Sequence, residues 1–269
     1  MIKIMRANGM LKFMLYLFVT STFGIVVNSQ NKDSLNTKKE ILFNGTSLDG
    51  WKGQEGIWSI KDGAITGENP KDAPIKQNTF LIWNKQLPEN YVINFKYRFK
   101  TPNGNSGLQY HSAVLNKDKF IVGGPQADFE TGNKYSGILY EERGRGIMAQ
   151  RGTAVTVDKN GKKNVTGKIN VPEDVDKSKA NNGWQDYKLV FYKNRAIHII
   201  NGYATIDVKL ESFHPKSHGR TLALQVHKGP HMIIQFKDME LINLDKISPA
   251  ESVKMFQKLS QETKNIAKY

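Results

Sequence analysis

The sequence contains no cysteine. This absence excludes a disulfide framework, a zinc–thiolate site, a cysteine nucleophile and a lipoprotein anchor. Long apolar runs are also scarce. One run, at residues 13–27, is shorter than the roughly 20 residues that span a bilayer, and later runs are only a few residues long. Because 39% of the 269 residues are hydrophobic and 10% are aromatic, most of the chain is able to bury a core rather than stay disordered.

The start of the chain has the three parts of a secretory signal peptide. Residues 1–12 carry basic side chains and no acid, the apolar run follows, and Ser29 supplies a small residue at its exit. We therefore expect residues 1–29 to be removed and residues 30–39 to form a flexible leader. The mature protein is expected to be exported, to the periplasm or outside the cell, with no integral membrane association.

From about residue 40 to residue 243, short alternating segments are separated by turn residues. Asp-Gly at 62–63 and Asn-Gly at 201–202 are typical of two-residue hairpin turns. Ten or more closely spaced strands with almost no helical period predict one all-β domain, a sandwich or jelly roll. The clearest strands are expected at 58–61, 64–66, 80–83, 91–99, 108–112, 187–192, 196–200, 203–208, 222–227 and 232–241.

Two segments depart from this rhythm. Residues 151–183 are polar, and we expect them to form a hairpin and a loop that project from the sandwich. In the tail, residues 244–269, Ser248 is a good N-cap and Pro249 suits the first helical turn. The tail is therefore predicted to hold a surface helix over about 249–266.

Three strands carry polar side chains on the face opposite their apolar residues, because residues two apart in a strand share a face. Such a face is costly to bury unless it is wet or binds a ligand. If the three faces meet, they form a concave polar surface suited to a polyhydroxylated ligand. The side chains concerned are Gln109 and His111, then Gln126, Asp128 and Glu130, and finally Gln225 and His227.

An ordered series of short motifs resembles the 3-keto-disaccharide hydrolase family. The series opens with Leu-Phe-Asn-Gly-Thr-Ser-Leu-Asp-Gly-Trp at 42–51, continues with Gly-Asn-Ser-Gly at 104–107 and Leu-Ala-Leu-Gln-Val-His-Lys-Gly-Pro at 222–230, and closes at 236–241. Each motif is weak alone, whereas the ordered set is specific and covers about residues 40–243. The resemblance implies a concanavalin-like jelly roll of two antiparallel sheets, secretion, and action on carbohydrates oxidised at C3.

The chemistry implied by this resemblance is removal of the C2 proton beside a C3 ketone, elimination of the C1 substituent, and hydration. It needs a base, an acid and a group that stabilises an enolate oxygen. The candidate catalytic residues are Glu130, His111 and His227. The candidate substrate-binding residues are Gln109, Gln126, Asp128, Arg143, Arg145 and Gln225. A divalent metal held by Asp128 and Glu130 is an alternative means of stabilising the enolate, and no other cofactor is implied.

Other interpretations remain open. Asp128 and Glu130 resemble the acids of a two-carboxylate glycosidase, but the third acid that pattern expects is replaced by Gly132. A tryptophan at 51, 58 or 83 suits the platform of a non-catalytic lectin-like module, although sandwich tryptophans are more often buried. The glycines around Arg145 also fit a tight turn held by a structural salt bridge.

Positive charge is in excess, with 39 lysines and arginines against 25 acids and a formal net charge of +14. Many of the lysines lie in the 151–183 segment and in the tail, without the interleaved aromatic residues that a nucleic-acid groove needs. We therefore expect a carbohydrate partner and no nucleic acid. The sugar, the linkage and the oligomeric state stay open.

Overall fold

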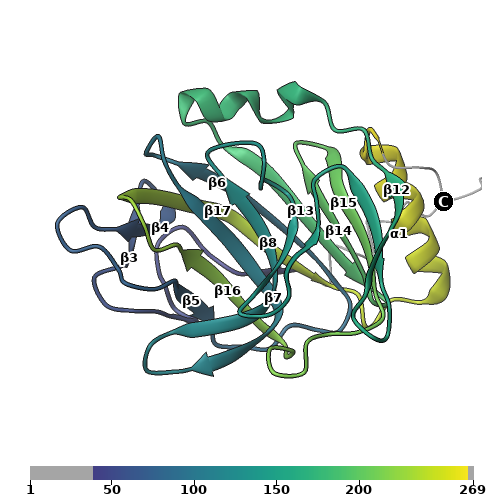
Figure 1. Ribbon diagram of the computed structural model, residues 1–269, viewed down its shortest axis with the longest axis horizontal. Coiled ribbons are helices and arrows are strands. Elements are labelled where there is room, and N and C mark those ends of the chain that lie inside the picture. Colours follow the sequence, from purple (N-terminus) through teal and green to yellow (C-terminus); the bar gives the residue numbers. More distant parts are fainter. Residues whose placement is uncertain (1–38, 266–269) are drawn as a thin grey trace, which may run out of the picture. The chain divides into compact units, whose positions relative to one another are not determined.

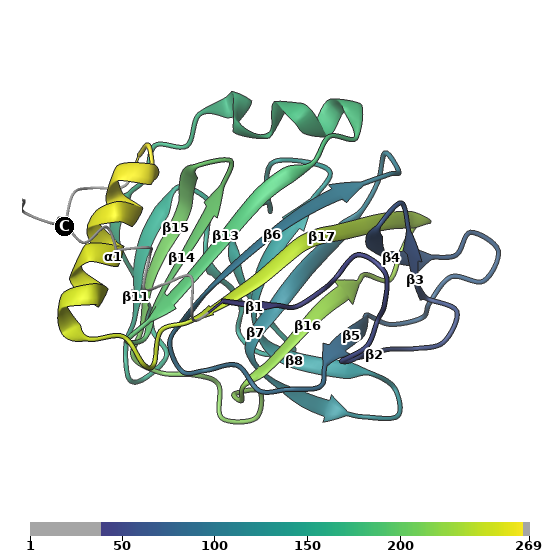
Figure 2. The ribbon, with the colours of Figure 1, turned by 180° about the vertical axis from the view of Figure 1, so that it is seen from behind.

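The computed structural model describes residues 39–265, which form a sandwich of two β-sheets with a C-terminal helix (Figure 1 and Figure 2). The predicted all-β jelly-roll fold is confirmed. The predicted signal peptide, residues 1–29, and nearly all of the predicted leader lie outside the described residues. Across residues 39–265, no helix has the length and apolar character needed to cross a membrane.

The larger sheet has ten strands. Its strands follow the order β12 (Lys163–Lys168), β11 (Thr153–Val157), β15 (Tyr203–Leu210), β14 (Arg195–Ile200), β13 (Gln185–Tyr192), β6 (Tyr91–Phe99), β17 (Met232–Asn243), β4 (Ala64–Asn69) and β3 (Trp58–Lys61), with β1 (Lys39–Ile41) also paired to β17. All of these pairs are antiparallel except β11 with β15, which is parallel. The expectation of purely antiparallel sheets is therefore corrected at this one edge.

The smaller sheet has seven strands. Their order is β10 (Gly146–Ala149), β9 (Leu139–Glu142), β8 (Ile121–Glu130), β7 (Asn105–Asn116), β16 (Thr221–Val226), β5 (Thr79–Trp83) and β2 (Trp51–Lys52). The core lies between the sheets and is rich in aromatic rings. Phe129 of β8 stacks on Tyr97 of β6 at 4.2 Å between ring centroids, which joins the two sheets. Burial of each such side chain stabilises the fold by about 1.5–3 kcal/mol.

The predicted hairpin turns form because their residues tolerate positive φ. Asp62 and Gly63 have φ of 55° and 67°, and Asn201 and Gly202 have φ of 50° and 82°. These values at both central positions match the turn whose twist suits flanking antiparallel strands. The turns set the registers of β3 with β4 and of β14 with β15.

The polar segment 151–183 does not project from the sandwich as expected. Its hairpin, β11 and β12, extends the larger sheet by pairing β11 with β15. It is followed by η2 (Glu173–Asn181), a 3₁₀ helix that the sequence analysis missed. Arg151 and Lys179 form ion pairs with the buried carboxylate of Asp176, so charged side chains fasten this segment to the sandwich.

The predicted C-terminal helix is present as α1 (Pro249–Glu262), and it ends before the expected residue 266. Ser248 and Glu251 form a capping box, in which the Ser248 hydroxyl accepts from the Glu251 N–H at 3.2 Å. Met255 and Leu259 pack in a second apolar cluster on the outer face of the larger sheet, whereas Val253 stays 55% exposed. The helix therefore covers part of that outer face.

Two buried histidines should make stability depend on pH. Burial lowers the pKa of His198 to about 3 and that of His111 to about 4, from an ordinary value of 6.5. Between pH 6.5 and the lowered pKa of each histidine, the unfolded chain binds a proton that the folded chain does not. The free energy of unfolding therefore falls as the pH falls through this range. From pH 7 to pH 4.5 we expect a loss of about 2–3 kcal/mol for each histidine, measured by urea unfolding.

The raised pKa of Asp128, described below, acts in the opposite direction. To isolate the contribution of His198, the free energy of unfolding is measured at both pH values for the unmodified protein and for His198→Gln. The difference between the two losses is the contribution of His198. The variant should lose less stability on acidification. Equal losses in the two proteins would show that His198 is not held neutral in the folded state.

Candidate active site

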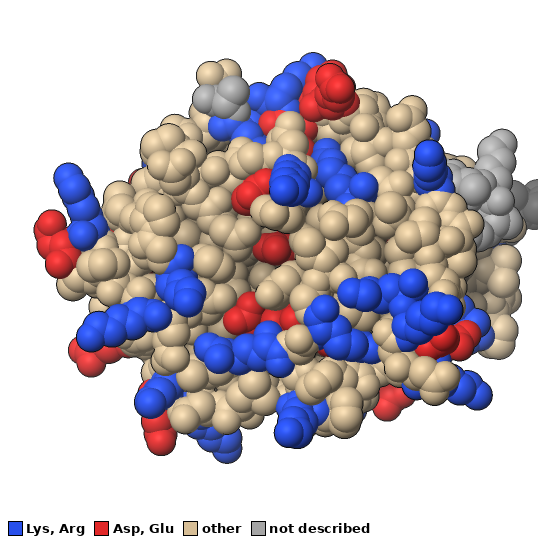
Figure 3. Space-filling model, in the orientation of Figure 1, with Lys and Arg blue, Asp and Glu red and all other residues tan. Residues whose placement is uncertain are grey.

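A pocket of about 560 Å³ lies on the outer face of the seven-stranded sheet, away from the core. Figure 3 shows this side of the molecule, where a few carboxylates lie in the central hollow and lysine and arginine side chains surround them. The lining residues come from β7, β8, β9, β10, β16 and the adjoining turns. They are Gln77, Asn78, Asn105, Gln126, Asp128, Tyr135, Ile138, Tyr140, Glu142, Arg143, Ile147, Gln225, His227 and Lys228.

Strand register explains how the floor of the pocket arises. Asp128 on β8 is opposite Gly107 on β7, and Leu224 on β16 is opposite Leu108. The next pair in the antiparallel register of β16 with β7 is Gln225 with Gly107, so Asp128 and Gln225 lie on either side of Gly107. A Cβ at Gly107 would lie 2.5 Å from the side chain of Gln126, so only glycine leaves room for that amide.

Gln126 and Gln225 line the floor, whereas Gln109 is buried behind Gln126 and does not line the pocket. The amides of Gln109 and Gln126 form a hydrogen bond of 2.6 Å, and the Gln126 amide lies 3.5 Å from Oδ1 of Asp128. Gln225 is fully buried, and neither its amide oxygen nor its amide nitrogen has a hydrogen-bond partner. An amide that lines a pocket with both polar atoms unpaired is costly unless a ligand completes its hydrogen bonds.

Asp128 is the strongly perturbed acid of the pocket. Burial raises its pKa well above the ordinary value of 3.8, and the carboxylates of Glu130 and Glu142 act in the same direction. Asp128 can therefore hold a proton at a pH where an exposed aspartate would have lost it. A neutral carboxyl group can donate a hydrogen bond, which a carboxylate cannot.

Glu142, on β9, is the second acid of the pocket. Its Oε1 accepts a hydrogen bond from Asn78 Nδ2 at 3.1 Å and lies 4.0 Å from Nε of Arg143. The side-chain oxygen of Asn78 in turn accepts from the backbone N–H of Lys228 at 3.0 Å. Asn78 thus ties β9 to the segment that follows β16, and that segment carries His227.

The tautomer of His227 follows from its hydrogen bond. Its Nδ1 lies 2.5 Å from the carbonyl oxygen of Lys228. A carbonyl oxygen only accepts, so Nδ1 must carry the proton, and Nε2 of the neutral ring keeps its lone pair. His227 is partly buried and lines the pocket, so in its neutral form the nitrogen without a proton is Nε2.

The structure does not bring His111 to this pocket. Strand β7 has a register shift between Gln109 and Ala113, and His111 has a φ of 47°. This bulge reverses the expected alternation and packs the imidazole against Phe191, with 4.0 Å between ring centroids. The sequence-based expectation that Gln109 and His111 share a face is therefore wrong.

Glu130 also lies outside the pocket lining. Its Oε1 accepts from the backbone N–H of Tyr135 at 3.0 Å, which holds the loop before β9. Within residues 39–265, no group of three or more histidine, aspartate or glutamate side chains is placed to hold a metal ion. Asp128 and Glu130 by themselves are too few ligands, so these residues do not fit the metal site considered above.

Arg145 lies in a structural ion pair and does not line the pocket. Its Nε is 2.7 Å from Oε2 of Glu141 and its Nη2 is 2.8 Å from Oε1. Although burial acts to raise the pKa of Glu141, the hydrogen bonds from Arg145 lower it overall. This arrangement matches the alternative of a tight turn held by a salt bridge. Arg143, in contrast, lines the pocket.

Replacing Arg145 by methionine should cost stability rather than ligand binding. It removes the guanidinium partner of the buried Glu141 carboxylate and leaves only the backbone N–H of residue 145 as a donor, so we expect the free energy of unfolding to fall by about 2–4 kcal/mol. Chemical denaturation measures the loss, and calorimetry with a saccharide ligand on the folded variant provides the comparison. A stable Arg145→Met protein that has lost its ligand would assign Arg145 to the binding site instead.

Sequence reasoning missed several residues of the pocket. Asn78, Tyr135, Tyr140, Glu142 and Lys228 line it but carried no signal of their own. Glu142 follows Glu141 in β9, and alternation alone puts the two acids on opposite faces. One acid of the pair had to face the same way as Asp128. Choosing Glu142 required knowing that β9 lies beside β8, which the sequence does not show.

The tryptophans do not form a sugar platform in this pocket. Trp51 and Trp83 are buried, and Trp51 Nε1 donates to the carbonyl oxygen of Leu42 at 2.8 Å. Trp58 packs against the core cluster. None of the three lines the pocket beside Asp128.

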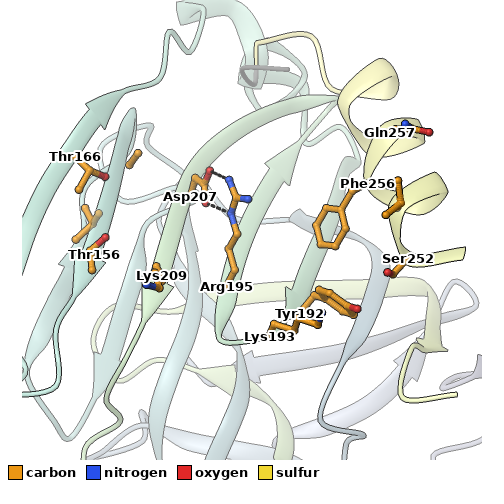
Figure 4. A pocket seen from close by; sticks show the side chains of 13 residues that line it. Thr156, Thr166, Tyr192, Lys193, Arg195, Asp207, Lys209, Ser252, Phe256 and Gln257 are labelled. Atoms are coloured by element: carbon orange, nitrogen blue, oxygen red, sulfur yellow. Dashed lines mark hydrogen bonds and ion pairs between the residues drawn. The ribbon is translucent and has the colours of Figure 1, made fainter. Parts of the chain in front are cut away.

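A larger pocket of about 680 Å³ lies between α1 and the outer face of β11, β14 and β15 (Figure 4). Its main charged groups, Arg195 and Asp207, are joined by a hydrogen bond of 2.7 Å between Nε and Oδ1, and Phe256 packs edge-on against Tyr192. We place the candidate site in the smaller pocket because Gln225 is unpaired there and the pKa of Asp128 is perturbed.

A family model matches most of the chain, and the solved structures that resemble it do so at low sequence identity. The family model of the 3-keto-alpha-glucoside-1,2-lyase-like domain matches residues 38–242. A candidate glycosyl hydrolase from Parabacteroides distasonis ATCC 8503 is 18% identical with a TM-score of 0.48, over 79% of this chain and 97% of that chain. A carbohydrate-binding module from Bacillus subtilis is 14% identical with a TM-score of 0.42, over 71% and 94%. Among curated proteins, none matches the chain.

Proposed function

Because this chain belongs to the family of 3-keto-alpha-glucoside-1,2-lyase-like domains, we propose that it cleaves the glycosidic bond of a 3-keto-glucoside. Elimination of the C1 substituent is the first step, and hydration of the unsaturated product gives net hydrolysis. The observation that carries the proposal is the pocket beside Asp128. It combines a carboxyl group of raised pKa, a histidine with a free Nε2 and a buried amide without partners.

The proposed proton transfers use the pocket's own residues. The C3 ketone acidifies the proton on C2, and Nε2 of His227 takes that proton. The negative charge that forms on the C3 oxygen accepts a hydrogen bond from the neutral carboxyl group of Asp128. As the C1–oxygen bond breaks, the enolate electrons form the C1–C2 double bond, and the imidazolium of His227 returns its proton to the leaving oxygen. The proton count is therefore balanced.

Binding of the sugar ring falls to the amides. Gln225 has one donor group and one acceptor group free, which suits a pair of neighbouring hydroxyl groups. Tyr140 adds a phenol, whose pKa burial raises, with Glu142 and Asp128 acting in the same direction. The phenol therefore stays a neutral donor at the pocket wall. These contacts would fix C2 toward His227 and the C3 oxygen toward Asp128.

The test incubates the purified protein with a 3-keto-glucoside and with its unoxidised parent, each with and without a chelator. Release of the aglycone from the 3-keto-glucoside alone supports the proposal. Release from the parent sugar would assign a two-carboxylate glycosidase. Binding without release from either would assign a lectin-like module. Loss of activity with chelator would place a metal in the reaction.

We also propose that the protein acts outside the cytoplasm, in the periplasm or in the medium. The support is the sequence pattern of residues 1–29, which has a basic start, a short apolar run and a small-residue exit. Mass spectrometry of the protein isolated from its own cells tests this. A mature chain starting near Gln30 supports export, and an intact Met1 contradicts it.

A further inference from the structure

Basic side chains surround the pocket that contains Asp128. Arg143 and Lys228 line it, and both are partly or largely exposed. Lys134 lies over the ring of Tyr135 at 5.1 Å, and Nζ of Lys163 donates to the carbonyl oxygen of Ile147 at 2.9 Å. Tyr135 and Ile147 both line the pocket, so four cations stand at or beside its opening.

Fewer negative charges face this opening. Glu142 is tied to Asn78, and the carboxyl of Asp128, buried at the floor, has a raised pKa that favours its neutral form. Glu141, the other acid of β9, does not line the pocket and is paired with Arg145. The positive charges at the rim therefore outnumber the negative charges within. Figure 3 shows the same pattern, with basic side chains around a small acidic centre.

A neutral disaccharide would gain nothing from this excess of positive charge. Arg143 has Glu142 at 4.0 Å, but both Arg143 and Lys228 are exposed, and an anion placed between them would form charge-assisted hydrogen bonds with both. The floor, with Asp128 and Gln225, offers the groups that the reacting ring needs. An anionic group would therefore sit farther out, on the part of the substrate that leaves.

We infer that the substrate is an acidic glycoside, whose leaving part carries a carboxylate or sulfate group held by Arg143 and Lys228. The inference rests on the proposed function in one respect, which is the assignment of the reacting ring and the leaving ring. The preference for an anion is a property of the pocket, and it can be measured by binding alone.

The experiment compares three unoxidised probes by isothermal titration calorimetry. They are maltose, the α-1,4-linked disaccharide of glucose with glucuronate as its reducing-end ring, and maltose sulfated at C6 of its reducing-end ring. At low salt we expect the better acidic probe to bind at least about tenfold more tightly than maltose, and the difference to shrink in 0.5 M salt. Tighter binding of one acidic probe than the other identifies the anion as carboxylate or sulfate.

The double variant Arg143→Gln with Lys228→Gln should lose the preference for acidic probes over maltose. Lys177→Gln is the control, since Lys177 is an exposed lysine on η2 that does not line the pocket. Equal affinity of the unmodified protein for all three probes, or a preference that survives the double variant, would overturn the inference. The proposed function is tested separately, by cleavage of 3-keto-maltose. If 3-keto-maltose is not cleaved, the proposed function fails whatever the binding results are.

Discussion

Replacement of His227 by alanine is expected to lower kcat on a 3-keto-glucoside by about 10²- to 10⁴-fold, the usual contribution of a general base. The hydrogen bond from Nδ1 to the carbonyl of Lys228 leaves Nε2 free to take the C2 proton. Alanine removes that nitrogen but none of the buried core. KM should change little, because the sugar is held mainly by Gln225 and its neighbours. Steady-state kinetics together with exchange of the C2 proton in heavy water measures the effect.

His231 is the matched control for this variant. Its Nδ1 also lies near a backbone carbonyl, that of Asn69, at 2.8 Å, and it does not line the pocket. His231→Ala should keep kcat. If His227→Ala still exchanges the C2 proton at the normal rate, the base is a different group. Glu142→Gln would then be the next variant, since Glu142 is the other candidate base that lines the pocket.

Much of the fold could be predicted because its determinants are local. The alternation of β8 puts Phe129 in the core and Asp128 on the outer face, and this follows directly from the two-residue period. The Asp62-Gly63 turn is equally local, since glycine and aspartate tolerate positive φ. Where a single strand or turn decides the outcome, the sequence is sufficient.

The parts of the site and fold that could not be predicted depend on pairing between strands that are distant in the sequence. His111 left the expected face because β7 bulges beside it, and nothing in its neighbours' polarity marks a bulge. Glu142 and Asn78 joined the site because β9 lies beside β8 and the segment before β5 reaches across. Parallel pairing of β11 with β15 likewise connects segments that are far apart in the chain. Such pairings are set by the whole sheet.

Replacement of Asp128 tests the other half of the proposed chemistry. Asp128→Ala removes the donor to the developing oxyanion and should lower kcat by about 10²- to 10³-fold. Asp128→Asn keeps an N–H donor of similar shape and should retain more activity. The exposed Asp186, 69% exposed and paired with Lys96 at 3.1 Å, supplies the control as Asp186→Asn. That variant should behave as the unmodified protein does.

The pH profile separates a donor role from a base role for Asp128. A donor must be protonated, so activity should fall as the pH rises through the raised pKa of Asp128, and this alkaline limb should disappear in Asp128→Asn. If Asp128 were instead the base, activity would rise with pH over the same range and Asp128→Asn would be inactive.

Replacing Asp128 by asparagine should change stability in the direction opposite to its effect on activity. A carboxyl whose folded pKa is raised contributes stability below its unfolded pKa, and that contribution is lost as the pH rises through the folded pKa. Asp128→Asn carries no charge to bury, so at neutral and alkaline pH it should unfold at a higher urea concentration than the unmodified protein. A variant that is both less active and more stable marks a group retained for its chemistry, whereas a fall in both would make Asp128 a structural residue.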